Sequence, residues 1–220
     1  MNIVHGIQGA SHAGRHGRRK AATRAALIQA GQQLIAEGRT DVSIATITEL
    51  ADVGFGSFYN HFKTKDQLFE AAFAEAMESF GHGLGRLVED VDDMARAVSI
   101  GFRVIIRVAR AKPGFASLVT RSGSAALQFD GALRRTSLHC IGRGIDSGRF
   151  SMPGPETAFA AIGGSLLGVV TYLLGDPMSD TDELVDSLAA GVLRMLGLPD
   201  EEARSIAHED LPEGVPEEYR

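Results

Sequence analysis

Apolar residues recur every three or four positions through most of the chain, interrupted by short polar or proline-containing segments. Over residues 20–37, Leu27, Leu34 and Ile35 share one helical face, and Gly38 stands where a glycine often ends a helix. No segment shows the sustained alternation of apolar and polar residues that indicates a half-buried strand. The pattern therefore predicts an all-α protein.

Two short helices are predicted after the first. Ser43 is a suitable N-cap for a helix that ends near Ala51, and the segment "DVGF" then interrupts the pattern. Helical spacing resumes in "GSFYNHF", where Phe58 and Phe62 are expected to face the core. A long helix followed by two short helices joined by a tight turn is the layout of a helix-turn-helix.

Later apolar periodicity predicts helices over about 65–87, 92–111, 114–121, 123–147, 155–174 and 181–197, with prolines at several of the breaks. We expect four regions: a flexible basic arm at 1–19, a three-helix helix-turn-helix domain at 20–67, a larger helical domain at 68–199, and an acidic, partly disordered tail at 200–220.

Basic residues are concentrated near the N-terminus. Residues 1–67 contain eight basic and five acidic side chains, a net charge of +3, whereas the whole chain has a formal net charge of -6. The rest of the chain therefore carries -9. Such asymmetry indicates an N-terminal surface for an acidic partner, most often nucleic acid.

Composition excludes several other classes of protein. Cys140 is the only cysteine, so the chain has no internal disulfide and no cysteine-based zinc site. No clustered nucleophile, base and carboxylate indicates an enzyme, and no spacing indicates a metal or a cofactor. The N-terminus lacks the apolar core of a secretion signal, and the uncharged stretch 157–175 is rich in glycine and lacks flanking basic residues. We therefore expect a cytoplasmic protein and interpret this stretch as a buried or subunit-interface helix, not a membrane span.

The order S-I-x-x-I-x-x-x-A-x-V-x-x-G-S-F-Y-x-H-F-x-x-K-x-x-L from Ser43 to Leu68 resembles the DNA-binding domain of the tetracycline-repressor (TetR) family of bacterial regulators. The resemblance covers roughly residues 21–70. It implies that the second short helix is the recognition helix and that the remaining helices form a domain for effector binding and dimerisation. It also implies a transcriptional regulator, usually a repressor, without catalysis.

Several side chains of this segment suit contacts with the DNA backbone. Tyr59 and His61 can donate to phosphate oxygens, and Lys65 begins a helix, where free N–H groups also favour an anion. Gly56 lets the backbone approach a phosphate closely, and Thr46 opens the preceding helix. Further phosphate contacts are expected from the basic run, namely Arg18, Arg19 and Lys20.

Base reading is expected from three residues of the recognition helix. Ser57 and Asn60 can hydrogen-bond to base edges, and Phe55 suits a thymine methyl group. For Phe55, packing against the first helix is an equal alternative. Asp52, Gly54 and Phe55 replace the family's usual turn glycine, hydroxyl cap and basic residue. These departures motivate an alternative hypothesis, a sensing or interaction module of the same fold that does not bind DNA specifically.

The last two long helices carry small and apolar residues suited to a two-fold, four-helix dimer interface, with core contacts within one subunit as the alternative. The expected interface residues are Ala160, Gly164, Gly168, Leu184, Leu188, Gly191, Val192 and Met195. A dimer would place two recognition helices one DNA turn apart and read a pseudo-palindromic operator.

Apolar residues with a few polar neighbours are expected to line a cavity for an apolar small-molecule effector, with plain core packing as the alternative. The expected lining residues are Phe80, Met94, Phe102, Arg103, Phe115, Leu118, Phe129, His139 and Tyr172. In the family mechanism, the effector favours a conformer whose recognition helices are wrongly spaced for DNA. Nothing in the sequence identifies the effector.

Overall fold

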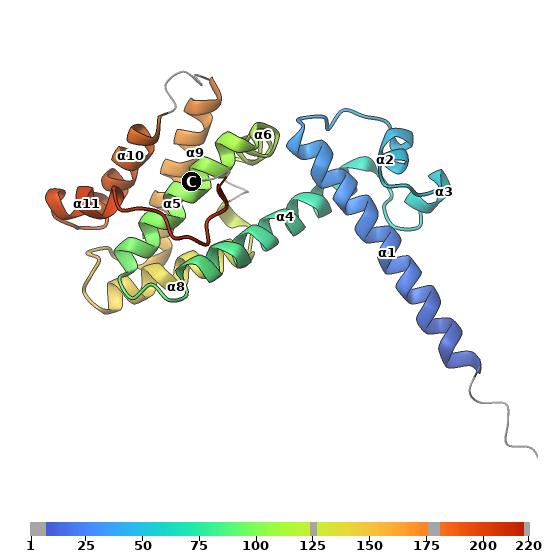
Figure 1. Ribbon diagram of the computed structural model, residues 1–220, viewed down its shortest axis with the longest axis horizontal. Coiled ribbons are helices and arrows are strands. Elements are labelled where there is room, and N and C mark those ends of the chain that lie inside the picture. Colours follow the sequence, from blue (N-terminus) through green and yellow to red (C-terminus); the bar gives the residue numbers. More distant parts are fainter. Residues whose placement is uncertain (1–7, 124–126, 176–180, 218–220) are drawn as a thin grey trace, which may run out of the picture. The chain divides into compact units, whose positions relative to one another are not determined.

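The computed structural model describes residues 8–123, 127–175 and 181–217, and all regular secondary structure in these ranges is helical (Figure 1). The chain divides into two compact units between Ala74 and Glu75. Helix α4, Lys65–Val88, contributes its first part to one unit and its remainder to the other, so the expected domain border at residue 67 falls within a continuous helix.

The first unit contains α1 (Gln8–Ala36), α2 (Ile44–Leu50), α3 (Phe55–Phe58) and the start of α4. Its core is made of apolar side chains from all four helices and the turn after α3. The fully or nearly fully buried residues include Leu27, Ile28, Leu34, Ile35, Ile47, Phe58, Phe62 and Leu68. Phe58 and Phe62 therefore face inward, as the spacing predicted.

The N-terminal arm is helical where the structure describes it. Helix α1 begins at Gln8, so the prediction of a flexible arm is wrong for residues 8–19. The glycines in this stretch favoured a coil interpretation. Extending an existing helix costs much less than nucleating one, and the amphipathic segment from residue 20 supplies the nucleus.

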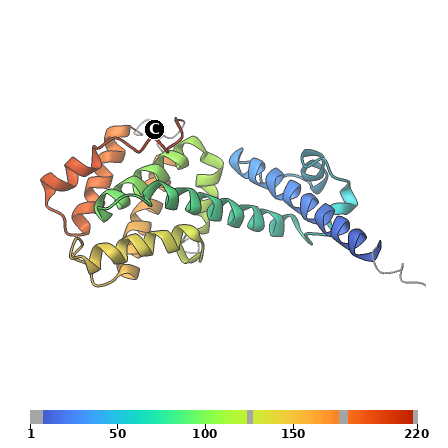
Figure 2. The ribbon, with the colours of Figure 1, turned by 60° about the horizontal axis from the view of Figure 1, so that its bottom comes forward.

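The second unit is built around α5, Met94–Ala111, which contacts α6 (Pro113–Ser122), α8 (Ala132–Asp146), α9 (Pro155–Gly175), α10 (Asp182–Met195) and α11 (Asp200–Ala207). Figure 2 shows α8 on one side of α5 and α10 with α11 on the other. The core includes Ile106, Val185, Leu193 and Leu196, each with no exposed surface.

Two segments of this unit differ from the sequence prediction. The helix expected over 123–147 begins at Ala132, because Gly123 ends α6 with a φ of 54° and Gly131 caps α8 in an extended conformation. The expected disordered tail is ordered over residues 200–217. Its apolar side chains Ala203, Ile206 and Val215 are buried in the core, and the first two lie on one face of α11.

Helix α9 is the one helix of the described chain that is long and apolar enough to cross a membrane by length and composition. Its most apolar window has a mean hydropathy of 1.8, and 22% of that window is buried. The inner face packs in the core through Ala158, Ile162 and Val170. Its larger apolar side chains, among them Phe159, Leu166 and Leu173, are half-buried against the core, and small residues such as Ala160, Gly164 and Gly168 are exposed.

Candidate DNA-binding surface and effector cavity

Helix α3 presents a small aromatic surface to solvent. Phe55 and Tyr59 are 55% and 54% exposed, and their rings meet edge to face with centroids 5.8 Å apart. Gly56 and Asn60 are also exposed, and a Cβ added at Gly56 would meet no atom within 4 Å. Ser57 is half-buried at the edge of this surface. Four of the expected DNA-contacting residues are thus exposed on one surface, where a nucleic acid could contact them.

The turn before α3 forms despite the unusual residues in it. Asp52 adopts a φ of 51°, in the left-handed region that glycine usually occupies and aspartate tolerates. Gly54 caps α3 in an extended conformation without a side-chain hydrogen bond. On α2, the Ser43 hydroxyl accepts from the Thr46 backbone N–H at 3.1 Å and lies 2.9 Å from the Thr46 hydroxyl. The helix-turn-helix geometry is therefore retained.

Basic side chains of α1 lie close to the end of α3. Burial lowers the pKa of His61 below its usual 6.5, and the charges of Lys20 and Arg24 lower it further. The Arg24 guanidinium lies 5.5 Å from the centre of the Phe62 ring. Arg18, Arg19 and Lys20 are exposed on α1. The positive charges of Lys20 and Arg24, which add to this lowering, also attract phosphates.

The Lys65 side chain already has an ion-pair partner within the chain. Its Nζ donates to Asp41 Oδ1 at 2.9 Å, and this hydrogen bond lowers the pKa of the Asp41 carboxyl. The pair is at the surface, with Asp41 fully exposed. A phosphate would have to compete with this carboxylate for Lys65.

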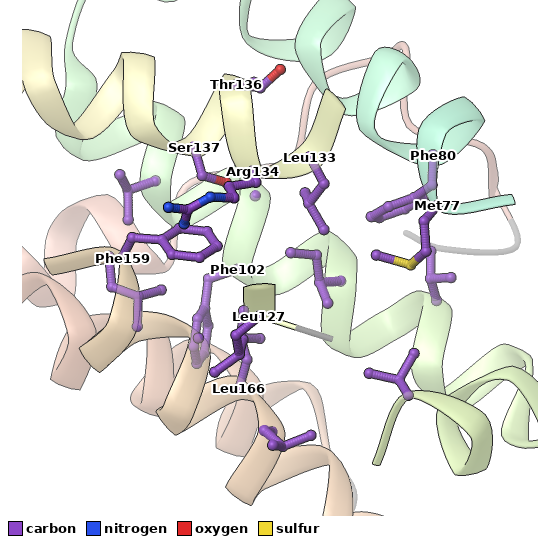
Figure 3. Close-up of a pocket in the computed structure, with 18 of the residues that line it drawn as sticks. Met77, Phe80, Phe102, Leu127, Leu133, Arg134, Thr136, Ser137, Phe159 and Leu166 are labelled. Carbon is purple, nitrogen blue, oxygen red and sulfur yellow. The ribbon is translucent and has the colours of Figure 1, made fainter. Parts of the chain in front are cut away.

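A cavity of about 160 Å³ lies within the second unit, among α4, α5, α6, α8 and α9 (Figure 3). Its wall is almost entirely apolar. It includes Met77, Phe80, Phe102, Leu127, Phe129, Leu133, Cys140, Phe159, Gly163 and Leu166. The expected residues Phe80, Phe102 and Phe129 are thus brought together.

Other residues expected at the cavity lie elsewhere. Met94 is buried at the start of α5, and Leu118 is half-buried on α6 but does not line the cavity. Arg103 points to α10, where its Nε donates to Asp186 at 2.7 Å. His139 and Tyr172 are exposed on α8 and α9. The side chain of Phe115 lies outside the described residues. Met94, Arg103, Leu118, His139 and Tyr172 lie on helices that line the cavity but do not line it themselves.

Arg134 is a cavity residue that the sequence interpretation missed. Its guanidinium lies 5.0 Å from the centre of the Phe159 ring and donates to Glu156 Oε2 at 2.6 Å. In Figure 3 it lies over that ring, beside Ser137. Leu133, Arg134, Ser137 and Cys140 follow helical spacing on α8, so an amphipathic reading of residues 132–146 could have placed Arg134 at the cavity.

The expected interface residues divide between the surface and the core. Ala160, Gly164 and Gly168 are exposed along one stripe of α9. On α10, Leu184, Leu188 and Gly191 are half-buried and Met195 is 37% exposed. Val192 is a correction: it is 5% exposed and lies in the core of its own chain. Its position, seven residues after the buried Val185, places it on the inner face of α10.

Comparison with protein families gives two matches. A model for the tetR family of bacterial regulatory proteins matches residues 27–72, and one for the tetracyclin repressor-like C-terminal domain matches residues 93–209, more than half the chain. The chain belongs to the tetR family. It is therefore a DNA-binding transcriptional regulator, with the predicted all-α fold of an N-terminal helix-turn-helix domain and a larger helical domain.

Solved structures of other tetR-family regulators have the same fold. The structure of RolR (NCGL1110) in complex with resorcinol is 31% identical, with a TM-score of 0.73, and the match covers 91% of this chain and 100% of that chain. RolR without ligand is 30% identical, with a TM-score of 0.70, covering 87% of this chain and 100% of that one. FadR from Bacillus subtilis with stearoyl-CoA shares the fold at 18% identity and a TM-score of 0.64, covering 78% and 96%. Curated protein sequences give no match.

Proposed function

We propose that this tetR-family regulator is a cytoplasmic repressor that binds a pseudo-palindromic operator as a homodimer and releases it when a small effector fills the cavity. The observation that carries the proposal is an apolar cavity in the same chain as an exposed helix-turn-helix surface. The ligand of RolR, resorcinol, supports a small effector here. The proposed role is regulatory and involves no catalytic step.

In the proposed DNA complex, α3 lies in the major groove. Phe55, Ser57 and Asn60 meet base edges, because their side chains are at least partly accessible on this short helix. Tyr59 and His61 donate to phosphates at its C-terminal end, and the exposed Gly56 lets its backbone approach the DNA.

The flanking elements supply further contacts with phosphates. Arg18, Arg19 and Lys20 extend the positive surface along α1, and Thr46 at the start of α2 meets the backbone. Lys65 exchanges the Asp41 carboxylate for a phosphate oxygen, an exchange of one exposed ion pair for another that costs little.

The proposed dimer is formed by α9 and α10 of two copies. The exposed stripe of Ala160, Gly164 and Gly168 allows a second α9 to approach closely, with Leu188 and Met195 on the neighbouring helix. The exposed stripe of small residues on this otherwise apolar helix supports such a close contact.

A charged substitution in this stripe tests the dimer. Gly164→Arg should give a folded monomer by light scattering at micromolar concentration and should lose operator binding, because one recognition helix cannot span both half-sites. Ser205→Arg, on the exposed face of α11, is the matched control and should remain a dimer. A wild-type protein that is itself monomeric at this concentration would contradict the proposal.

DNA contact is tested by fluorescence anisotropy with DNA that flanks the protein's own gene. Tyr59→Phe removes only the hydroxyl, whereas Tyr59→Ala also removes the exposed ring. We expect both variants to fold like the wild type and to bind operator progressively more weakly. Equal binding by all three proteins would remove Tyr59 from the interface.

A further inference from the structure

We propose that the effector is a neutral molecule, about the size of one substituted benzene ring, which Arg134 recognises through a hydroxyl or carbonyl oxygen. The proposal rests on the proposed effector-binding role of the cavity and adds the chemical class of the ligand.

The size of the ligand follows from the cavity. Its volume is about 160 Å³. An apolar protein cavity of about 150 Å³ holds one benzene molecule. On the α9 side, Leu127 packs directly against Gly163, where an added Cβ would lie 2.6 Å from its Cδ2 atom. A longer molecule, such as a fatty acyl chain, would exceed this volume.

The position of the ligand's polar group follows from Arg134. It is the one charged residue that lines the cavity among the described residues, and its side chain is 24% exposed. Ser137 lies three positions further along α8, on the same helix face. Thr136 turns its hydroxyl toward α4, where a Cβ added at Gly85 would lie 3.3 Å from its Oγ1. One end of an otherwise apolar cavity thus offers hydrogen bonds from Arg134 and Ser137.

The charge of the ligand follows from Glu156. Its Oε2 atom accepts from Arg134 at 2.6 Å, so the guanidinium already has a negative partner. Arginine has five N–H donors, and a neutral oxygen can bind a further one without disturbing this pair. An anionic ligand would have to displace Glu156 or place an uncompensated negative charge against apolar side chains. The pair therefore selects for neutral ligands.

Three probes that share one ring separate these contributions: toluene, phenol and benzoate, each titrated calorimetrically into the full-length protein at pH 7.5. Toluene measures the cavity alone, phenol adds a neutral oxygen, and benzoate adds a charge. In the wild type we expect phenol to bind about tenfold more tightly than toluene, since hydrogen bonds to charged groups are among the stronger ones. Benzoate should bind more weakly than phenol.

Two variants test the roles of the paired side chains. Arg134→Met should remove the preference for phenol over toluene, with Arg143→Met on the exposed face of α8 as the matched control. Glu156→Gln, at a side chain that is 65% exposed, should raise the affinity for benzoate at least fivefold and leave toluene unchanged, because it frees the guanidinium charge. If Arg134→Met fails to fold, Ser137→Ala takes its place and should weaken phenol binding alone.

The outcomes separate this proposal from the proposed function. Toluene binding with no preference for phenol, or a wild type that prefers benzoate, would overturn the inference while leaving the cavity as an effector site. Binding of none of the three probes would overturn both the ligand class and the cavity as the site for a molecule of this size.

Discussion

Phe55 and Phe58 are three positions apart in one short helix, yet their truncation should have opposite consequences. Phe58 has no exposed surface, and its ring centroid lies 5.5 Å from that of Tyr59 and 5.9 Å from that of Phe62. Removing such a ring typically costs about 3–5 kcal/mol. Phe58→Ala should therefore unfold the helix-turn-helix unit at a much lower temperature and abolish operator binding through loss of structure.

Phe55→Ala should leave the fold intact and weaken DNA binding. The ring is 55% exposed, so its main loss within the protein is the edge-to-face contact with Tyr59, worth about 0.5–1.5 kcal/mol. Burying the exposed half of a side chain of roughly 200 Å², about 110 Å², against DNA contributes at most about 2.7 kcal/mol at about 25 cal/mol per Å². A partial contact of about 1–2 kcal/mol lowers operator affinity roughly five- to thirtyfold.

Circular dichroism melts and operator anisotropy on the same preparations distinguish the two effects. Leucine at position 55 is the matched variant, because it keeps an apolar side chain that can meet a thymine methyl group. The reasoning is refuted if Phe55→Ala destabilises the protein as much as Phe58→Ala, or if it melts normally and binds operator with unchanged affinity.

Three further predictions concern groups with shifted pKa values. Burial raises the pKa of the Cys140 thiol above its usual value, so at pH 8 this only cysteine should react with maleimide more slowly than in the unfolded chain, and phenol should slow it further. Labelling as fast as in denaturant would contradict the burial. The folded pKa of His61 lies below 6.5, so the folded state resists its protonation and the free energy of unfolding should fall as the pH drops below about 6.5. Thermal melts from pH 7.5 to 5.5 should show this fall. His61→Gln should show a smaller dependence of stability on pH. Asp93 caps α5 by accepting from the Ala95 N–H, and the paired Arg149 guanidinium lowers its pKa. Asp93→Ala should lower the free energy of unfolding by about 1–3 kcal/mol, whereas Asp93→Asn should lower it less because it keeps the cap. Equal melting temperatures for both variants would refute the cap.

The helix-turn-helix could be predicted almost residue by residue because local sequence determines it. The Ser43 cap, the turn at Asp52 and the inward spacing of Phe58 and Phe62 each depend on neighbours within a few positions. The helical extension of α1 to Gln8 was missed because composition alone does not reveal that an adjacent helix lowers the cost of extension.

The cavity could be predicted only in part because it depends on which face each helix turns inward. Phe80, Phe102 and Phe129 could be predicted from their size, because large apolar side chains favour burial whichever way their helix is turned. Tyr172 was assigned by the same reasoning, but it is exposed on α9 and does not line the cavity. Arg134 was missed because a charged residue joins an apolar wall only when a partner such as Glu156 is close in space.

The dependence of operator affinity on salt tests the central claim most directly. We expect the dimer to contact phosphates through Arg18, Arg19, Lys20 and their neighbours. It should bind operator-containing DNA much more tightly than scrambled DNA. The logarithm of its affinity should fall steeply with the logarithm of the salt concentration, by about 0.9 for each phosphate contact. Lys20→Gln should reduce that slope by about 2 in a dimer, one contact from each protomer. A folded dimer that binds with no preference for operator, or with a slope near zero, would contradict the account.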